Sequence, residues 1–314
     1  IEKMIKNTGY SEISLSSLSS SDYSKIDDLI KGLKNRYENR NLGISLPSLR
    51  MNPYSVQVAD DISGGKRTGF TFAPEAGSQR LRDIINKGVE EEDVLATAEA
   101  AIRGGWENLK FYFMIGLPFE TDEDVAEIFE LASKVIKRCR PISKRINVTV
   151  SVSNFVPKPH TPFQWAEQMD IEEMKRKHKI LKDLFRTSKH CTLRIHDMRK
   201  SYLEGFLSRG DERTGDLIEL AWKKGAKLDD YKDNYDIWKS SADELGIDEK
   251  DYLGARDLEN NLPWDIVDIG VDKGFLLREY KKAEEGTLTP DCREVCSGCG
   301  MKKRFPNCLK IATD

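Results

Sequence analysis

The sequence has no hydrophobic run long enough to cross a bilayer, and its start lacks a basic segment followed by an apolar one. A membrane-spanning helix needs roughly 20 consecutive apolar residues, and a secretory signal needs the basic-then-apolar pattern. These absences predict a cytoplasmic protein with no membrane partner. In that compartment the six cysteines are expected to be thiols or metal ligands rather than disulfides.

An excess of charge of either sign is also absent, since 50 basic residues oppose 53 acidic ones for a net charge of −3. This balance gives no overall attraction to nucleic acid or to an anionic membrane. Hydrophobic residues make up 39% of the 314 residues, which is enough for a large core in one barrel or two ordinary domains.

Strands and helices alternate through the first half of the chain, which is typical of βαβ units and a parallel sheet. Helices are expected over Val89–Arg103 and from Thr121, whose spacing to Asp124 resembles a capping box. Beyond Trp165 helices dominate, apart from a β-rich run at Thr192–Ile195. The expected strands are Glu12–Ser16, Gly43–Pro47, Thr68–Ala73, Leu109–Ile115 and Arg145–Asn154.

Three segments with ligand-like turns follow the third, fourth and fifth of these strands. They are Phe72–Ser78, Met114–Thr121 and Asn154–Phe163, and the first two contain Glu75 and a Gly-x-Pro-x-Glu turn. The carboxyl ends of parallel strands share one edge of a sheet, where barrel enzymes place their chemistry. A Gly-x-Pro-x-Glu turn can also be an ordinary connector, with Glu120 only favouring the positive end of the next helix.

Taken together, the three segments resemble the radical S-adenosylmethionine (SAM) enzymes, in particular the branch with the tRNA and ribosomal-protein methylthiotransferases. The resemblance covers about residues 1–165. A closer one, to uncharacterised radical SAM proteins with a cobalamin-binding-like domain before the barrel, continues to the terminal cysteines. It runs through Arg209–Arg213, Tyr235–Trp238 and Pro263–Asp265.

The resemblance implies an α/β fold, an incomplete (βα)6 partial TIM barrel with a mainly helical C-terminal extension. The expected domains are residues 1–190 for the barrel, 191–285 for the extension and 286–314 for a cysteine-rich tail. Five barrel strands are one short of six, and the family places its first strand and its 4Fe–4S cluster loop before a helix like the one that opens this chain. The chain is therefore expected to be a fragment that lacks the cluster loop and is inactive alone.

The resemblance also implies which residues bind SAM. Glu75 matches the glutamate near the polar groups of SAM, and Gly77 is expected to let the backbone approach the ligand. Ser78 is a candidate cap of the following helix. The backbones of Met114, Ile115 and Gly116, and of Asn154, Phe155 and Val156, match the segments on the two sides of the adenine.

Three further candidates precede the first turn. Ser48 and Arg50 are placed to meet a carboxylate, although an ordinary surface ion pair would explain Arg50 equally well. Ser17 stands where many radical SAM enzymes have Gly-Gly-Glu, and its hydroxyl could either bind the ligand or cap a helix.

Four cysteines lie in the tail, within 17 residues, which favours a metal site. Zinc and a second iron–sulfur cluster suit four thiolates equally, and an unmetallated, disordered tail is the alternative. The spacing C-x3-C-x2-C equals that of the radical SAM cluster, but this tail follows the last barrel strand instead of the first. The candidate ligands are Cys292, Cys296, Cys299 and Cys308.

The function that the resemblance implies is reductive cleavage of SAM at a 4Fe–4S cluster, with an electron donor such as flavodoxin or ferredoxin. Methylthiolation or methylation of RNA or protein would follow, with cobalamin as a further candidate cofactor of the full-length protein. The rival is a metal-stapled nucleic-acid-binding module that uses Lys302, Lys303 and Arg304. A hydrolytic barrel has no support, because the sequence shows neither a His/Asp metal cluster nor a nucleophile elbow.

Overall fold

The computed structural model describes residues 1–15, 23–37, 43–45, 51–52, 54–57, 69–227, 231–292 and 294–308. The strands β3 (Phe70–Glu75), β4 (Asn108–Ile115), β5 (Asn147–Asn154) and β6 (Cys191–Ile195) form a parallel sheet in that order. A second parallel sheet pairs β1 (Glu12–Ser14) with β2 (Gly43–Ser45). The α/β fold class is confirmed, and it is consistent with a partial radical SAM barrel.

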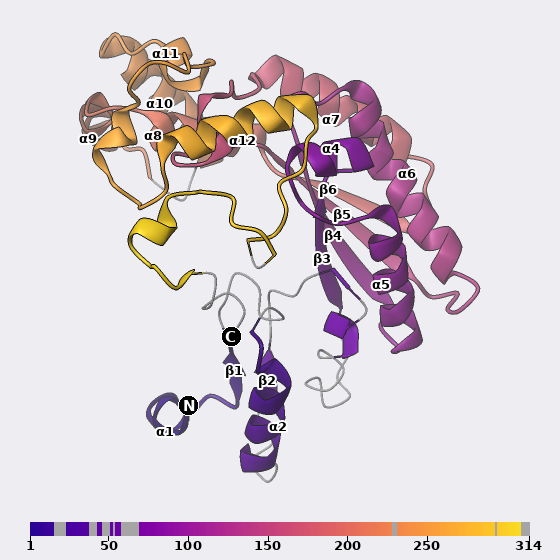
Figure 1. Ribbon diagram of the computed structural model, residues 1–314. Coiled ribbons are helices and arrows are strands. Elements are labelled where there is room, and N and C mark those ends of the chain that lie inside the picture. Colours follow the sequence, from indigo (N-terminus) through magenta and orange to yellow (C-terminus); the bar gives the residue numbers. More distant parts are fainter. Residues whose placement is uncertain are drawn as a thin grey trace.

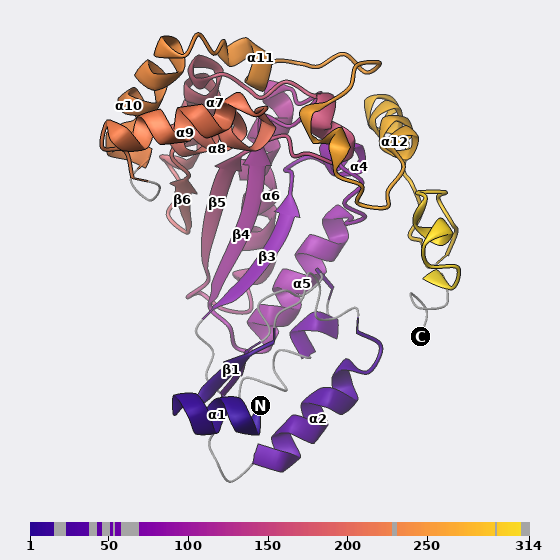
Figure 2. The same ribbon diagram turned by 90° about the vertical axis from the view of Figure 1, so that its left-hand side faces the viewer.

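Helices α5 (Glu91–Arg103), α6 (Asp122–Cys139) and α7 (Ile171–Phe185) follow β3, β4 and β5 in the chain, respectively. They lie on one side of the sheet (Figures 1 and 2). Near the N-terminus, α1 (Glu2–Thr8) and α2 (Ile26–Tyr37) lie with β1 and β2 at the far end of the sheet from α12 (Lys273–Glu285).

Strand β4 shows why the helices cover only one side. Leu109, Phe111, Phe113 and Ile115 are buried in the core with apolar residues of α5 and α6, whereas the intervening Lys110, Tyr112 and Met114 are only half-buried. Because successive side chains of a strand point to opposite faces, the odd-numbered residues bind the sheet to its helices. The even-numbered ones leave a more polar face on the other side.

Local capping signals fix where the helices begin. Thr121 and Asp124 form the expected capping box at the start of α6, and Glu90 with Asp93 forms another before α5. Helix α4 (Gln79–Ile84) begins after Ser78, whose hydroxyl accepts a hydrogen bond from the Leu81 amide at 3.1 Å. The predicted capping role of Ser78 is confirmed.

The sheet continues past the proposed barrel boundary at residue 190, because β6 pairs with β5 along its whole length. Beyond it, the extension has its own core, in which Tyr202, Phe206, Trp238 and Tyr252 are buried. Its elements are α8 (Met198–Arg209), α9 (Arg213–Lys223), α10 (Tyr231–Glu244), α11 (Glu249–Leu253), α12 and the short 3-10 turn η4 (Pro263–Ile266). Two other 3-10 turns lie outside it, η3 (Pro162–Trp165) after β5 and η5 (Met301–Lys303) in the tail. Within the described ranges, no helix is both long and apolar enough to cross a bilayer.

His178 joins α7 to the end of β5. It is buried, and its Nε2 lies 2.7 Å from the side-chain oxygen of Asn154. The amide nitrogen of Asn154 donates to the Ser201 hydroxyl of α8 at 3.1 Å. Burial, helped by the charge of Lys182, lowers the pKa of His178 to about 4. The imidazole is therefore neutral at pH 7 and donates its proton to Asn154.

We expect Gly77→Ala to lower the free energy of unfolding by about 1–3 kcal/mol, because overpacking of a close contact is destabilising. A Cβ at Gly77 would lie 2.3 Å from the backbone nitrogen of Ile128 in α6. The matched control is Gly32→Ala inside α2, where a Cβ meets nothing within 4 Å. That change should be neutral or stabilise by up to about 1 kcal/mol. Urea unfolding measures both, and equal effects would contradict close packing of α6 on this turn.

We expect stability to fall as the pH drops from 6.5 to 4, in part because of His178. Its pKa is about 4 in the folded protein against an ordinary 6.5, so the unfolded chain binds the additional proton in this window. The His178 contribution is fully present above pH 6.5 and amounts to about 3 kcal/mol. Urea unfolding of His178→Gln should show a shallower decline between these pH values. A variant profile parallel to that of the wild type would refute the role of this histidine.

Candidate active site

The turn after β3 carries a strained acidic residue. Glu75 has φ +70°, a left-handed conformation that is uncommon for residues other than glycine, and a register shift between β3 and β4 precedes it. Its carboxylate lies 3.3 Å from the ammonium of Lys87, and both side chains are partly exposed. Lys87 follows α4 in the chain, so the helix and the acidic turn are joined by this ion pair.

A buried arginine holds this turn in place. Arg82 is fully buried, and its guanidinium donates to the carbonyl oxygens of Ala76 at 3.1 Å, Gly77 at 2.7 Å and Val89 at 3.0 Å. Burial lowers the pKa of Arg82, although nearby acids oppose the effect. The fixed fork of guanidinium donors suits three carbonyls at once. Sequence analysis missed this role, because nothing in the pattern of α4 marks Arg82 as buried.

Gly77 packs closely on α6. Its missing side chain makes room for the backbone of that helix at Ile128, and the expected approach of a ligand to Gly77 stays a prediction. Next to it, the Ser78 hydroxyl donates to Asp124 at 2.5 Å, and Asp124 also pairs with Arg80. Burial would raise the pKa of Asp124, but the hydrogen bonds from Arg80, Ser78 and the Thr121 amide hold it below its usual range.

The turn after β4 is built around a buried ion pair. Gly116 has φ +80°, and its amide donates to the Glu120 carboxylate at 2.8 Å. Lys177 of α7 reaches the same carboxylate oxygen at 2.7 Å, and the Glu120 side chain is 1% exposed. Burial raises the pKa of Glu120, while Lys177 and the amides of Gly116 and Leu117 oppose this rise. Glu120 therefore does more than favour a helix N-terminus: it fixes the turn to α7.

Both expected strand segments beside the adenine lie at this edge. In β4, Ile115 is buried toward the helices and Met114 is half-buried on the other face. In β5, the Asn154 side chain is turned toward the helices by its bonds to His178 and Ser201. Phe155 follows with its amide bonded to the Ile115 carbonyl at 2.8 Å, and Val156 is buried.

The turn after β5 also contains a residue in a conformation that favours glycine. His160 has φ +57° although it carries a side chain. Its amide donates to the side-chain oxygen of Gln164 at 3.0 Å. Left-handed residues thus occur at or after the ends of three adjacent strands: Glu75 is the last residue of β3, Phe119 (φ +65°) lies in the turn after β4, and His160 lies in the turn after β5. Backbone strain of this kind is typical of functional sites.

One aromatic ring from the extension covers part of this edge. Tyr280 of α12 lies 5.9 Å from Phe119, 6.3 Å from Phe163 and 6.1 Å from Trp165, measured between ring centroids. Phe163 also meets Phe155 edge-on at 5.9 Å. Figure 1 shows α12 passing beside α4 above the strand ends. The proposed ligand residues Ser17, Ser48 and Arg50 lie outside the described residues.

The four tail cysteines are described, with Cys292 and Cys296 exposed and Cys299 and Cys308 half-buried. Over the described ranges, no three His, Cys, Asp or Glu side chains are grouped so that they could hold a metal ion. The tail contacts the extension instead: Lys303 pairs with Asp272 at 2.9 Å and Arg304 pairs with Asp268. Two of the three basic residues that favoured a nucleic-acid module are thus occupied by carboxylates.

Comparison with known proteins gives the family of the N-terminal part. Residues 1–132 match the model of the radical SAM superfamily. The chain is also 31% identical over 251 residues to the uncharacterized protein MJ0966 of Methanocaldococcus jannaschii, an alignment that covers 76% of this chain and 53% of that protein. The chain therefore spans about half the length of this relative. Over residues 1–132 the protein carries a radical SAM superfamily domain.

Proposed function

We propose that this chain is the SAM-binding part of a radical SAM enzyme. The observation that carries the proposal is the strained, partly exposed Glu75 at the carboxyl edge of a parallel sheet, within a radical SAM domain. In this proposal SAM accepts one electron and its sulfonium carbon–sulfur bond breaks, giving methionine and a 5′-deoxyadenosyl radical. The radical then takes a hydrogen atom from the substrate.

A 4Fe–4S cluster, when bound, supplies that electron and holds the amino and carboxylate groups of SAM. The described residues do not fit it, because they contain no group of three ligand side chains at this edge. We propose that the cluster ligands belong to a part of the protein outside these 314 residues, in keeping with the greater length of the relative. No step at the cluster is assigned to residues of this chain.

The roles proposed for this chain concern SAM itself. The Glu75 carboxylate accepts hydrogen bonds from polar groups of SAM, in place of or beside Lys87. Met114 and Phe155 contribute the half-buried apolar surface against which the adenine lies. Arg82 and Glu120 act as positioning residues, since each side chain is bonded to the backbone of one turn and does not itself contact SAM.

The proposed substrate is RNA or protein, modified by methylthiolation or methylation, with flavodoxin or ferredoxin as electron donor and cobalamin as a further cofactor of the longer protein. The resemblance of the three turns to the methylthiotransferase branch supports this finer assignment. We also propose that Cys292, Cys296, Cys299 and Cys308, which are not grouped as ligands in this structure, come together to bind zinc or a second iron–sulfur cluster. Four thiols within 17 residues are a donor set that both metals accept.

We expect Glu75→Gln to weaken SAM binding by about 10- to 100-fold, because a charge-assisted hydrogen bond contributes about 1.5–3 kcal/mol. Isothermal titration calorimetry of the chain with SAM measures this. Glu92→Gln is the matched control, since Glu92 is also paired, with Arg138 at 2.7 Å, but lies on α5 away from the edge. Equal affinities of Glu75→Gln and the wild type would refute the role of Glu75.

The activity itself is tested on the longer protein, reconstituted anaerobically with iron and sulfide. Dithionite should then convert SAM to methionine and 5′-deoxyadenosine, and Glu75→Gln should slow this conversion. A folded, cluster-loaded protein that binds SAM but leaves it intact would overturn the enzymatic proposal while keeping the SAM site.

We expect the tail to hold about one zinc ion, or one iron–sulfur cluster with absorption near 400 nm, per chain. Metal analysis of Cys296→Ser should show a clear loss. Cys191→Ser is the control: Cys191 is a half-buried thiol of β6, and burial raises its pKa to about 11, which keeps it protonated. Equal metal content in wild type and Cys296→Ser would contradict the tail site.

A further inference from the structure

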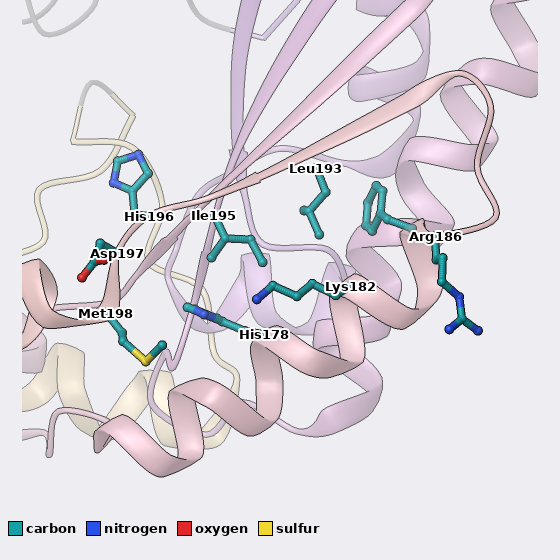
Figure 3. A pocket seen from close by; sticks show the side chains of 9 residues that line it. His178, Lys182, Arg186, Leu193, Ile195, His196, Asp197 and Met198 are labelled. Atoms are coloured by element: carbon teal, nitrogen blue, oxygen red, sulfur yellow. The ribbon is translucent and has the colours of Figure 1, made fainter. Parts of the chain in front are cut away.

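A pocket of about 480 Å³ lies on the helix-covered side of the sheet, between α7 and β6. Figure 3 shows its lining side chains, which come from α7, from β6 and from the turn that leads into α8. β6 is the last strand of the sheet among the described residues. The volume falls in the range of small-molecule sites.

The pocket has an apolar wall and a polar mouth. Phe185, Leu193, Ile195 and Met198 supply the apolar side chains. The imidazole of His178 adds a flat, neutral surface, since its Nε2 is already bonded to Asn154 and its pKa is about 4. Such a wall favours a ring or a short aliphatic group of a ligand.

One cation of the pocket is directed into it. Lys182 extends along the pocket between Ile195 and His178, whereas Arg186 lies at the outer rim (Figure 3). The effect of Lys182 on the pKa of His178 agrees with this proximity. Across the described part of the chain, neither Lys182 nor Arg186 has a carboxylate within ion-pair distance. Other lysines of α7 are paired, Lys175 with Glu172 and Lys179 with Asp183, both at 2.5 Å.

The only acid among the lining residues, Asp197, caps the N-terminus of α8. Its carboxylate accepts from the Arg199 amide at 2.8 Å. Lys182 is therefore left with a positive charge beside an apolar wall, an arrangement that suits a small organic anion. The anionic group would meet the ammonium, and the apolar part would replace water on Leu193, Ile195 and Phe185.

We propose that this pocket binds a small aromatic or aliphatic carboxylate, sulfonate or phosphate ester, with Lys182 as its charge partner. This pocket is separate from the proposed SAM site. The pocket lies against α7 on the helix-covered face of the sheet, whereas Met114 and the other half-buried residues of β4 lie on the opposite face. It stands whether or not the chain binds SAM.

The probes are 8-anilinonaphthalene-1-sulfonate, an aromatic anion that fluoresces when it leaves water, and benzoate as its competitor. We expect one sulfonate per chain, displaced by benzoate, and about tenfold weaker binding to Lys182→Gln, equivalent to the loss of about 1.4 kcal/mol. Lys179→Gln is the matched control, since it removes the same charge from the same helix at a lysine that is 76% exposed and paired. It should bind like the wild type.

A second variant guards against a change in folding. Leu193→Ala should enlarge the pocket and weaken binding while Lys182 is kept, and thermal melts would confirm that each variant is folded. Several sulfonate molecules per chain, or equal losses in Lys179→Gln and Lys182→Gln, would overturn the proposal. So would a folded wild type that binds neither probe. A concentration-dependent dimer that Lys182→Glu dissociates would instead assign this face to a second copy of the chain and also refute the proposal.

Discussion

Strand β4 is the constraint on which the rest of the barrel depends. It pairs with β5 along all eight of its residues and with β3 through one register shift. Its alternation sends Phe111 and Phe113 into the helix-facing core and Tyr112 to the other face. A slip by one residue would exchange these faces and expose the core. The same pairing brings the ends of β3, β4 and β5 to one edge, where all three candidate turns lie.

The turns at that edge are held by charges that would be costly if left unpaired. Arg82 is buried against three carbonyls, and Glu120 is buried against Lys177 and two amides. Burying either charge without partners would cost several kcal/mol, so these contacts leave each turn few alternative conformations. The left-handed backbone of Glu75 persists because its surroundings are fixed in this way. The buried contacts of Arg82 and Glu120 therefore account both for the rigidity of the turns and for the strained backbone of Glu75.

Local signals in the sequence predicted much of this fold. The five strands of the first half were placed with errors of a few residues, and the caps at Ser78 and Thr121 were found because capping depends on residues within one turn. The Glu120–Lys177 pair joins residues 57 positions apart, and no local pattern reveals it. The packing of Gly77 on α6 was missed for the same reason, since the atoms that leave no room for a side chain belong to a helix about 50 residues further along the chain. What depends on packing between distant segments had to come from the structure.

The extension also contributes residues to this edge. Ala283 of α12 is buried with Leu81 and Leu117, and Tyr280 contacts the rings around them. Just beyond α12, the Thr289 amide and carbonyl each bond the side chain of Asn86 at 3.1 Å. Asn86 has φ +50° and directly precedes Lys87, the partner of Glu75. Asn86, which bonds the tail at Thr289, and Lys87, which pairs with Glu75, are thus consecutive residues. The contact of the tail at Thr289 and the Lys87–Glu75 contact therefore both involve the short connection between α4 and α5.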